Sequence, residues 1–288
     1  MMTSLAIVNE EMAEKLAGFA VEALLQELHL TPKPGLVDKK NSGAHCDMNL
    51  SLMEASAYEL RDSFFKMALA AACKQPSQPL RERLAAIGRY GEKEMLRATD
   101  GVNTHKGAIW TLGLLTAASG MLFSQRTPRE LACIDVLQAA GAIAAFEDRY
   151  APKQVTNGDR VRKKFGVRGA REEAAAYFPS LRKAALPAWR RYSGEPEQIR
   201  NLNILLSLMA VVDDTCILHR SNGAVLAEVK RRAKGILTNG GLGVSSNWEL
   251  YSSLDRFIMD NGVSPGGSAD LLAATLLLQK LMYHFKIT

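Results

Sequence analysis

The chain is poor in cysteine and lacks long uncharged apolar runs. Its four cysteines, Cys46, Cys73, Cys133 and Cys216, are far apart among 288 residues and form no CxxC pair. This spacing argues against a structural zinc site and a disulfide framework and favours a reducing compartment. No secretory leader pattern opens the sequence, and no run reaches the ~18 uncharged apolar residues of a membrane span. We therefore expect a cytoplasmic protein without a membrane partner.

Neither sign of charge dominates the chain. There are 36 basic and 30 acidic residues, the formal net charge is +6, and the two signs are interleaved. Such a mild excess suits small anionic ligands as well as nucleic acid. Two basic clusters lack the interleaved aromatic residues that stack on bases, so they favour solvated helix faces, and no nucleic-acid partner is expected. The clusters comprise Arg160, Arg162, Lys163, Lys164, Arg168 and Arg171, and then Lys230, Arg231 and Arg232.

Strand-like alternation is scarce, whereas apolar residues recur at helical spacing almost everywhere. The pattern predicts an all-α fold, a single-domain multi-helix bundle over residues 1–288, because no long or low-complexity linker divides the chain. Capping motifs predict helix starts at Thr127 and Ser246. The remaining helices are predicted along an apolar stripe from Met12 to Leu28 and over residues 50–73, 82–98, 107–124, 169–184, 198–219, 223–238 and 268–284.

Two predicted helices are apolar nearly all round and should be buried central helices, over residues 203–212 and 271–278. The first runs without a break into Asp213 and Asp214. Carboxylates inside a core need a cation, such as a bound metal or Arg220. If the helix instead ends in water at this point, both aspartates are solvated. The pattern leaves both interpretations open.

Two polar blocks interrupt the helical pattern, over residues 31–48 and 101–107. Each combines glycine with Lys, His and hydrogen-bonding side chains. Glycine lets backbone N–H groups approach a phosphate, cationic side chains neutralise it, and a helix that starts after the loop adds its positive end. The blocks therefore predict a polyphosphate ligand. A third glycine-bearing block, residues 264–270, precedes the last helix.

Single residues in these blocks allow more than one interpretation. His45 and His105 lie in polar loops, where binding residues concentrate, and local context favours a functional role for both. Taken alone, Lys33 and Lys106 are more typical of surface lysines. Asp270, just inside the last predicted helix, fits a helix cap as well as a catalytic group.

The blocks together form a series of motifs in a fixed order. They are Pro32-Lys33-Pro34-Gly35-Leu36-Val37-Asp38, Gly43-Ala44-His45 with Asp47-Met48, Gly101-Val102-Asn103-Thr104-His105-Lys106-Gly107-Ala108-Ile109, Asp214-Thr215, and Ser264-Pro265-Gly266-Gly267-Ser268-Ala269-Asp270. This series resembles the triphosphoribosyl-dephospho-CoA synthase family from residue 22 to residue 278. The family has citrate lyase and malonate decarboxylase branches. Residues 107–110, 166–171 and 185–187 look closer to the malonate decarboxylase branch.

The resemblance implies a transferase that takes ATP and 3′-dephospho-CoA as substrates. Such an enzyme expels adenine and joins the triphosphoribosyl unit to the ribose 2′-hydroxyl of the acceptor. The product is the prosthetic-group precursor of an acyl carrier protein, to which a different enzyme attaches it. A homodimer and a transient contact with that prosthetic-group transfer machinery are both compatible with this role.

The bond that breaks dictates which groups the site needs. When the purine leaves, the anomeric carbon takes on oxocarbenium character, which carboxylates stabilise. One group must also take the proton of the acceptor hydroxyl. The phosphates need magnesium and cationic side chains. We assign to Asp38, Asp47 and Asp214 the role of binding magnesium or stabilising the oxocarbenium. Glu27 is assigned the role of the base. Phosphate and nucleotide contacts are assigned to Lys33, Gly35, His45, Asn103, Thr104, His105, Lys106, Arg220, Gly266, Gly267 and Ser268, with Asn103 and Thr104 as orienting groups.

The chain departs from the family pattern at three places. Cys46 stands where Arg or Lys is expected, Asp100 where a small residue is usual, and Ser221-Asn222 replaces a Gly-Gly pair. Each departure would weaken phosphate contact or loop geometry, yet none removes a proposed carboxylate, so an active enzyme remains favoured. Two other functions stay open, a metal-dependent nucleotide hydrolase and a non-catalytic helical module that binds nucleotide or a carrier protein.

Overall fold

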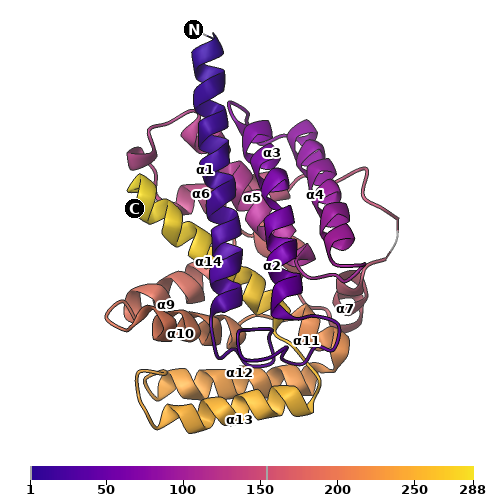
Figure 1. Ribbon diagram of the computed structural model, residues 1–288, viewed down its shortest axis with the longest axis vertical. Helices are drawn as coiled ribbons and strands as arrows, with labels where there is room; N and C mark the ends of the chain where they lie inside the picture. Colours follow the sequence, from indigo (N-terminus) through magenta and orange to yellow (C-terminus); the bar gives the residue numbers. More distant parts are fainter. Residues whose placement is uncertain (1, 154) are drawn as a thin grey trace.

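The computed structural model describes residues 2–153 and 155–288, and within them every regular element is a helix (Figure 1). The all-α prediction is therefore confirmed. The elements are α1 (Met2–His29), α2 (Leu50–Glu59), α3 (Arg61–Ala71), α4 (Gln78–Ala98), α5 (Lys106–Phe123), the 3₁₀ turn η1 (Pro128–Glu130), α6 (Cys133–Ala144), α7 (Asn157–Phe165), α8 (Ala170–Ala175), the π-helical η2 (Leu181–Ala185), α9 (Leu186–Arg191), α10 (Glu197–Met209), α11 (Thr215–Arg220), α12 (Gly223–Thr238), α13 (Asn247–Asp260) and α14 (Gly266–Phe285).

The core forms where α1, α3, α5 and α14 pack against one another. In Figure 1, α12 and α13 lie side by side below the C-terminal end of α1, next to the loop that joins α1 to α2. Helix α5 has a mean hydropathy of 1.2 over 18 residues, enough by length and composition to cross a membrane, but 78% of it is buried inside the fold. Burial of that kind is expected for the core helix of a helical bundle.

The two predicted central helices differ in outcome. Every residue from Leu271 to Leu278 is buried, so the interpretation of this part of α14 is confirmed. In the other segment α10 stops at Met209, and Val211 is exposed. The prediction of one unbroken helix over 198–219 is therefore wrong, because the chain leaves the helix before Asp214 and starts α11 anew.

Other helix boundaries were also misjudged. The helix predicted over 50–73 is interrupted at Leu60, which separates α2 from α3. The helix predicted over 169–184 breaks after α8, where Phe178 takes a positive φ of 51° immediately before Pro179. A residue that precedes proline is disfavoured in the right-handed helical region, which accounts for this break. By contrast, α12 spans the predicted residues 223–238.

The capping motifs mark real boundaries without the expected side-chain bonds. At Thr127 only the single turn η1 forms, its side chain makes no cap bond, and α6 begins later at Cys133. Helix α13 begins directly after Ser246, again without a side-chain cap bond. Helix α7 lies outside all predicted ranges, although Thr156 and Asp159 form a reciprocal capping box at its start.

The contact between α3 and α5 depends on a glycine. Gly120 is buried, and a Cβ there would lie closer than 3.0 Å to the carbonyl oxygen of Ala68. We expect Gly120→Ala to lower the free energy of unfolding by about 1–3 kcal/mol, because rigid backbone would have to move apart. The control Gly235→Ala lies in α12 where a Cβ meets nothing within 4 Å, and it should raise stability by ~0.5–1 kcal/mol. Denaturant melts measure both, and equal effects would contradict the packing argument.

Candidate active site

A cavity of about 1220 Å³ opens where the C-terminal end of α1 meets the N-terminal ends of α5, α11 and α14. The first turns of α5 and α14 line it, so the positive ends of these two long helices lie at the cavity and favour an anionic ligand. The loop between α1 and α2 and the region of α7 and α8 complete the wall. Its charged and titratable residues are Glu27, Lys33, His45, Asp47, His105, Lys106, Arg160, Arg168, Glu173, Asp213, Asp214, Cys216, His219, Arg220 and Asp270.

The cavity brings together most of the residues predicted for the site, although they come from five separate segments of the chain. Those that line it are Glu27, Lys33, His45, Asp47, Asn103, Thr104, His105, Lys106, Asp214, Arg220, Gly266 and Gly267. The structure places the other three, Gly35, Asp38 and Ser268, in the surrounding framework.

Asp38 organises the loop after α1. Its side chain is buried, its Oδ2 accepts the amide of Lys33 at 2.8 Å, and its Oδ1 accepts the amides of Lys40 and Asn41 at 2.7 and 3.1 Å. Both oxygens therefore accept hydrogen bonds from backbone amides. Asp38 positions Lys33 and does not reach the cavity.

Gly35 lets the same loop pack on α13. Its φ is +66°, and a Cβ there would lie closer than 3.0 Å to Ile258 and to the carbonyl oxygen of Val263. Its amide donates to Asp255 Oδ1 at 3.1 Å. Only glycine accommodates both this backbone conformation and this contact, so Gly35 shapes the loop from outside the cavity.

Lys33 and Glu27 form a buried ion pair in the cavity wall. Lys33 Nζ lies 2.6 Å from Glu27 Oε1 and 2.8 Å from the Glu27 carbonyl oxygen, and the two side chains are only 1% and 7% exposed. An ammonium group has three hydrogens, so the pair leaves Lys33 one for a ligand. The main role of Lys33 is thus to neutralise Glu27 and to anchor the loop to the end of α1.

Asp214 joins the start of α11 to the start of α14. Its side chain is buried; Oδ1 accepts the amides of Cys216 at 3.0 Å and Gly267 at 3.3 Å, and Oδ2 accepts the amide and hydroxyl of Ser268 at 2.8 and 3.0 Å. Burial raises the pKa of Asp214, and these hydrogen bonds oppose that rise. Of the two interpretations that the sequence left open, burial holds for this residue. Ser268, predicted as a nucleotide contact, instead holds Asp214.

The neighbouring aspartate behaves differently. The side chain of Asp213 is 43% exposed and forms an ion pair with Lys230 of α12. Solvation, one of the two interpretations left open by the sequence, therefore holds for Asp213 alone. Helix α10 has already ended at Met209, and α11 begins directly after Asp214, whose side chain accepts the amide of Cys216 in the geometry of an N-cap.

His105 is buried at the start of α5, with 3% of the residue exposed. Its Nδ1 lies 2.7 Å from Ser56 Oγ, which lies 2.6 Å from Thr104 Oγ1. Its Nε2 is buried without a partner among the described residues, although the residue lines the cavity. Burial, and secondly the charge of Lys33, lower the pKa of His105 to about 4, so the ring is neutral at pH 7.

His45 is held from the other side by α11. Arg220 donates from Nη2 to His45 Nδ1 at 3.0 Å and from Nη1 to the carbonyl oxygen of Ala44 at 3.1 Å. Burial and the charge of Arg220 lower the pKa of His45, and Asp47, 3.7 Å away, opposes them. Because Nδ1 accepts from Arg220, the neutral ring carries its proton on Nε2.

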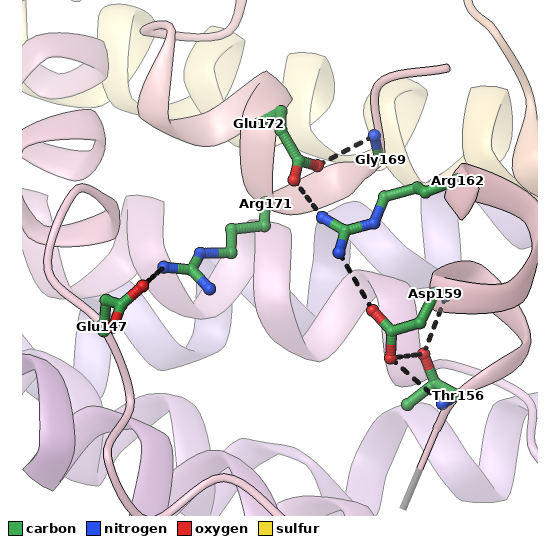
Figure 2. Close-up of polar contacts among 7 residues, drawn as sticks. All are labelled: Glu147, Thr156, Asp159, Arg162, Gly169, Arg171 and Glu172. Atoms are coloured by element: carbon green, nitrogen blue, oxygen red, sulfur yellow. Dashed lines mark hydrogen bonds and ion pairs between the residues drawn. The ribbon is translucent and has the colours of Figure 1, made fainter. Parts of the chain in front are cut away.

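The sequence interpretation missed cationic residues of the α7 and α8 region. Figure 2 shows how the basic cluster divides: Arg162 lies between Asp159 and Glu172, and Arg171 faces Glu147. These arginines hold the α7 and α8 region together. Two others, Arg160 and Arg168, line the cavity.

A signal for this part of the site was present in the sequence. The reciprocal capping box of Thr156 and Asp159 starts α7, with Thr156 Oγ1 accepting the Asp159 amide at 3.2 Å and Asp159 Oδ2 accepting the Thr156 amide at 3.0 Å. A helix predicted there would have placed Arg160 in its first turn. The basic cluster was instead interpreted as a solvated helix face; Arg160 and Arg168 are exposed, and they also line the cavity.

The three departures from the family pattern are accommodated by the fold. Cys46 is exposed. Asp100 adopts a φ of 49°, a conformation that favours glycine and that aspartate tolerates better than most residues. Asn222 caps α12 and accepts the amides of Ala224 and Val225 at 2.9 and 3.1 Å, a role that two glycines could not fill with side chains.

The all-helical fold and the anion-suited cavity define a helical protein that binds a phosphorylated ligand. Comparison with known proteins identifies the family. Residues 13–288 match the family model described as CitG: ATP:dephospho-CoA triphosphoribosyl transferase. The chain belongs to this family.

Related proteins carry a matching name. A protein of Pseudomonas fluorescens is 44% identical over 273 residues, which cover 94% of this chain and 92% of the relative. Proteins of Pseudomonas paraeruginosa and Azotobacter vinelandii are 44% and 43% identical over 279 residues, which cover 96% of this chain and 94% of each relative. All three are named probable 2-(5″-triphosphoribosyl)-3′-dephosphocoenzyme-A synthase. No solved structure matches the chain.

The two adjacent aspartates provide a matched test. Asp214→Asn puts an amide where a carboxylate oxygen accepts two donors, so we expect the free energy of unfolding to fall by about 2–4 kcal/mol and turnover to be lost. Asp213→Asn breaks only a half-exposed ion pair and should cost about 1 kcal/mol or less. Denaturant melts of both variants check this. Similar losses in the two would show that Asp214 does not hold α11 to α14.

His105 should make stability depend on pH. The ordinary pKa of a histidine is 6.5, and burial lowers that of His105 to about 4. The neutral ring is therefore favoured on folding, and the stability that it contributes is lost as pH falls from 6.5 to 4. This amounts to about 3 kcal/mol at most. In denaturant melts across this range, the free energy of unfolding of the wild type should fall with decreasing pH. For His105→Gln it should fall less steeply, whatever the absolute stability of the variant. Parallel slopes would contradict the buried neutral state.

Proposed function

We propose that this chain catalyses triphosphoribosyl transfer from ATP to the ribose 2′-hydroxyl of 3′-dephospho-CoA, with release of adenine. The observation that carries the proposal is the single cavity in which the family's separated motifs meet, with cations, helix N-termini and carboxylates around one space. Its volume, about 1220 Å³, exceeds the roughly 300–1,000 Å³ of a site for one small ligand. The cavity therefore has room for two nucleotides.

The phosphates would meet arginine side chains and a neutral histidine donor on two sides of the cavity. Arg220 and His45 lie on the side of α11 and the first loop, and Arg160 and Arg168 lie on the side of α7 and α8. Arginine suits this task because its planar guanidinium forms paired hydrogen bonds with phosphate oxygens. Lys106, at the start of α5, forms an ion pair with Glu92 and is partly exposed, so it can reach a ligand at the cavity edge.

The sugar would lie against the buried polar groups at the ends of α1 and α5. Glu27 uses Oε1 for Lys33, and Oε2 makes no hydrogen bond among the described residues, so this oxygen can take the proton of the acceptor hydroxyl. The neutral His105 lines the same cavity, its Nε2 is buried without a partner among the described residues, and this atom would orient a hydroxyl or phosphate group. Asp214 cannot act as a base or as a free metal ligand, because four donors already occupy its oxygens.

Magnesium would enter with the triphosphate. The described residues contain no group of three or more His, Cys, Asp or Glu arranged around a metal site. This fits a metal that keeps several waters and is held by one or two carboxylates together with substrate phosphates. Of the three aspartates assigned to magnesium, Asp47 fits best, since its side chain is 55% exposed and lines the cavity. The ion would screen phosphate charge there.

We further propose that the product serves malonate decarboxylase. Residues 107–110 and 166–171, whose resemblance favours that branch over the citrate lyase branch, include parts of the cavity wall at Gly107 and at residues 166–170. Segments that line a substrate cavity are where branches of one family can differ in substrate contacts.

Product analysis tests the proposed activity. With ATP, magnesium and 3′-dephospho-CoA, the protein should release adenine and form one triphosphoribosyl-dephospho-CoA per adenine, as seen by mass spectrometry. Omitting the acceptor should abolish adenine release. Phosphate release without adenine would instead support a nucleotide hydrolase. Nucleotide binding without any product would support a non-catalytic module.

A further inference from the structure

One carboxyl group in the cavity has no role in the scheme above. Asp270 lies in the second turn of α14 and lines the cavity, close to Gly107 at the start of α5. A Cβ on residue 107 would lie closer than 3.0 Å to Asp270 Oδ2, so the glycine makes room for this carboxyl. Protein surrounds Asp270, and the surface that it keeps faces the cavity.

The neighbouring carboxylates are compensated, and Asp270 is not. Glu27 has the ammonium of Lys33, and Asp214 has the amide and hydroxyl donors at the starts of α11 and α14. Asp270 accepts no hydrogen bond and forms no ion pair among the described residues, so it is not the helix cap that the sequence allowed. An isolated ionised carboxylate in such a place is costly, and the group avoids the cost by keeping its proton.

The charged groups around Asp270 also favour its protonated form. Burial, and secondly the like charges of Glu27 in α1 and Asp214 just before α11, raise the pKa of Asp270 well above the usual range. Cys216 of α11 lines the same cavity; the protein packed around its thiol and the carboxyl groups of Asp214 and Asp270 raise the pKa of that thiol, so it adds no charge. Lys33 is committed to Glu27, and His105 is neutral. In the part of the chain that the structure describes, no cation pairs with Asp270.

We propose that Asp270 is the general acid that protonates adenine as it leaves. This inference rests on the proposed transferase function. A purine departs from a ribose more easily when a ring nitrogen receives a proton, and a neutral carboxylic acid inside the cavity supplies one. The acid and the proposed base, Glu27, are then two different carboxyl groups of one cavity.

The step balances without any further reactant. The bond between the anomeric carbon and adenine N9 breaks with its electron pair on the purine, and the proton of Asp270 moves to an adenine ring nitrogen. The acceptor 2′-oxygen forms the new bond to the anomeric carbon and gives its proton to the base, for which Glu27 is proposed. Return of that proton from the base to Asp270 restores the starting state, and neutral adenine is released.

Other groups in the cavity are less suited to this task. His105 has a pKa of about 4 and carries no ionisable proton at pH 7 beyond its neutral N–H. Asp214 has both oxygens occupied by donors. The alternative role for Asp270 itself is that of a metal ligand, because a magnesium ion would also relieve its charge. The experiment must separate these two roles.

The test compares two leaving groups in the full-length protein. Asp270→Asn should lower kcat with ATP by about 10²–10⁴-fold, with little change in KM. A ribose 5-triphosphate that carries 4-nitrophenol at the anomeric carbon needs no acid, because nitrophenolate leaves unprotonated. With this substrate and 3′-dephospho-CoA, the variant should stay within about tenfold of wild type. Asp270→Glu, which keeps a carboxyl group, should retain part of the ATP activity.

The pH profile gives a second readout. Since the acid acts only when protonated, wild-type kcat with ATP should fall as pH rises through the pKa of Asp270, and this alkaline limb should be absent with the nitrophenyl substrate. The Asn variant should melt at the wild-type temperature or above it, because it removes a carboxyl without hydrogen bonds. A melt at the wild-type temperature rules out misfolding as the cause of lost activity.

Three results would overturn the assignment. If Asp270→Asn loses the same activity on both substrates, the residue serves binding or structure and not proton donation. Recovery of the variant at raised magnesium would make it a metal ligand, and full activity with ATP would remove it from the reaction. In each case wild type still releases adenine with 3′-dephospho-CoA. If wild type itself forms no adenine, the proposed function fails, and the role of Asp270 fails with it.

Discussion

The cavity depends on one buried carboxylate placed between two helix starts. Asp214 accepts donors from the first turn of α11 and from the first turn of α14, so it sets the angle at which these helices meet. An ionised group can be buried at this point because amide and hydroxyl donors replace the water it loses. Through α11, the same contact brings Arg220 to the first loop, where it holds His45.

A second constraint is the distribution of charge along the cavity. Glu27, Asp214 and Asp270 lie together, and the structure compensates the first with Lys33 and the second with hydrogen-bond donors. The third is left without a partner. A glycosyl transfer needs an acid for the leaving group and a base for the acceptor, and neighbouring carboxyl groups with different partners can provide both.

Much of the candidate site could be predicted because its residues stand in dense polar blocks within a helical sequence. Histidine, lysine and glycine in loops mark a phosphate site whether or not their spatial relation is known. The sequence could not show that Asp38 faces backbone amides, or that Gly35 packs on α13, since both facts depend on contacts within a loop fold. It also could not separate Arg160 and Arg168 from Arg162 and Arg171, because all four share one basic cluster.

The sequence by itself determined the helical class, the buried helix over residues 271–278 and the family, because periodicity and ordered motifs are local properties of the chain. Tertiary structure alone decided where helices break and which charges are compensated. Adjacent Asp213 and Asp214 show the difference: one pairs with Lys230 near the surface, and the other is buried between α11 and α14. Burial and partners come from distant segments, and no local pattern records them.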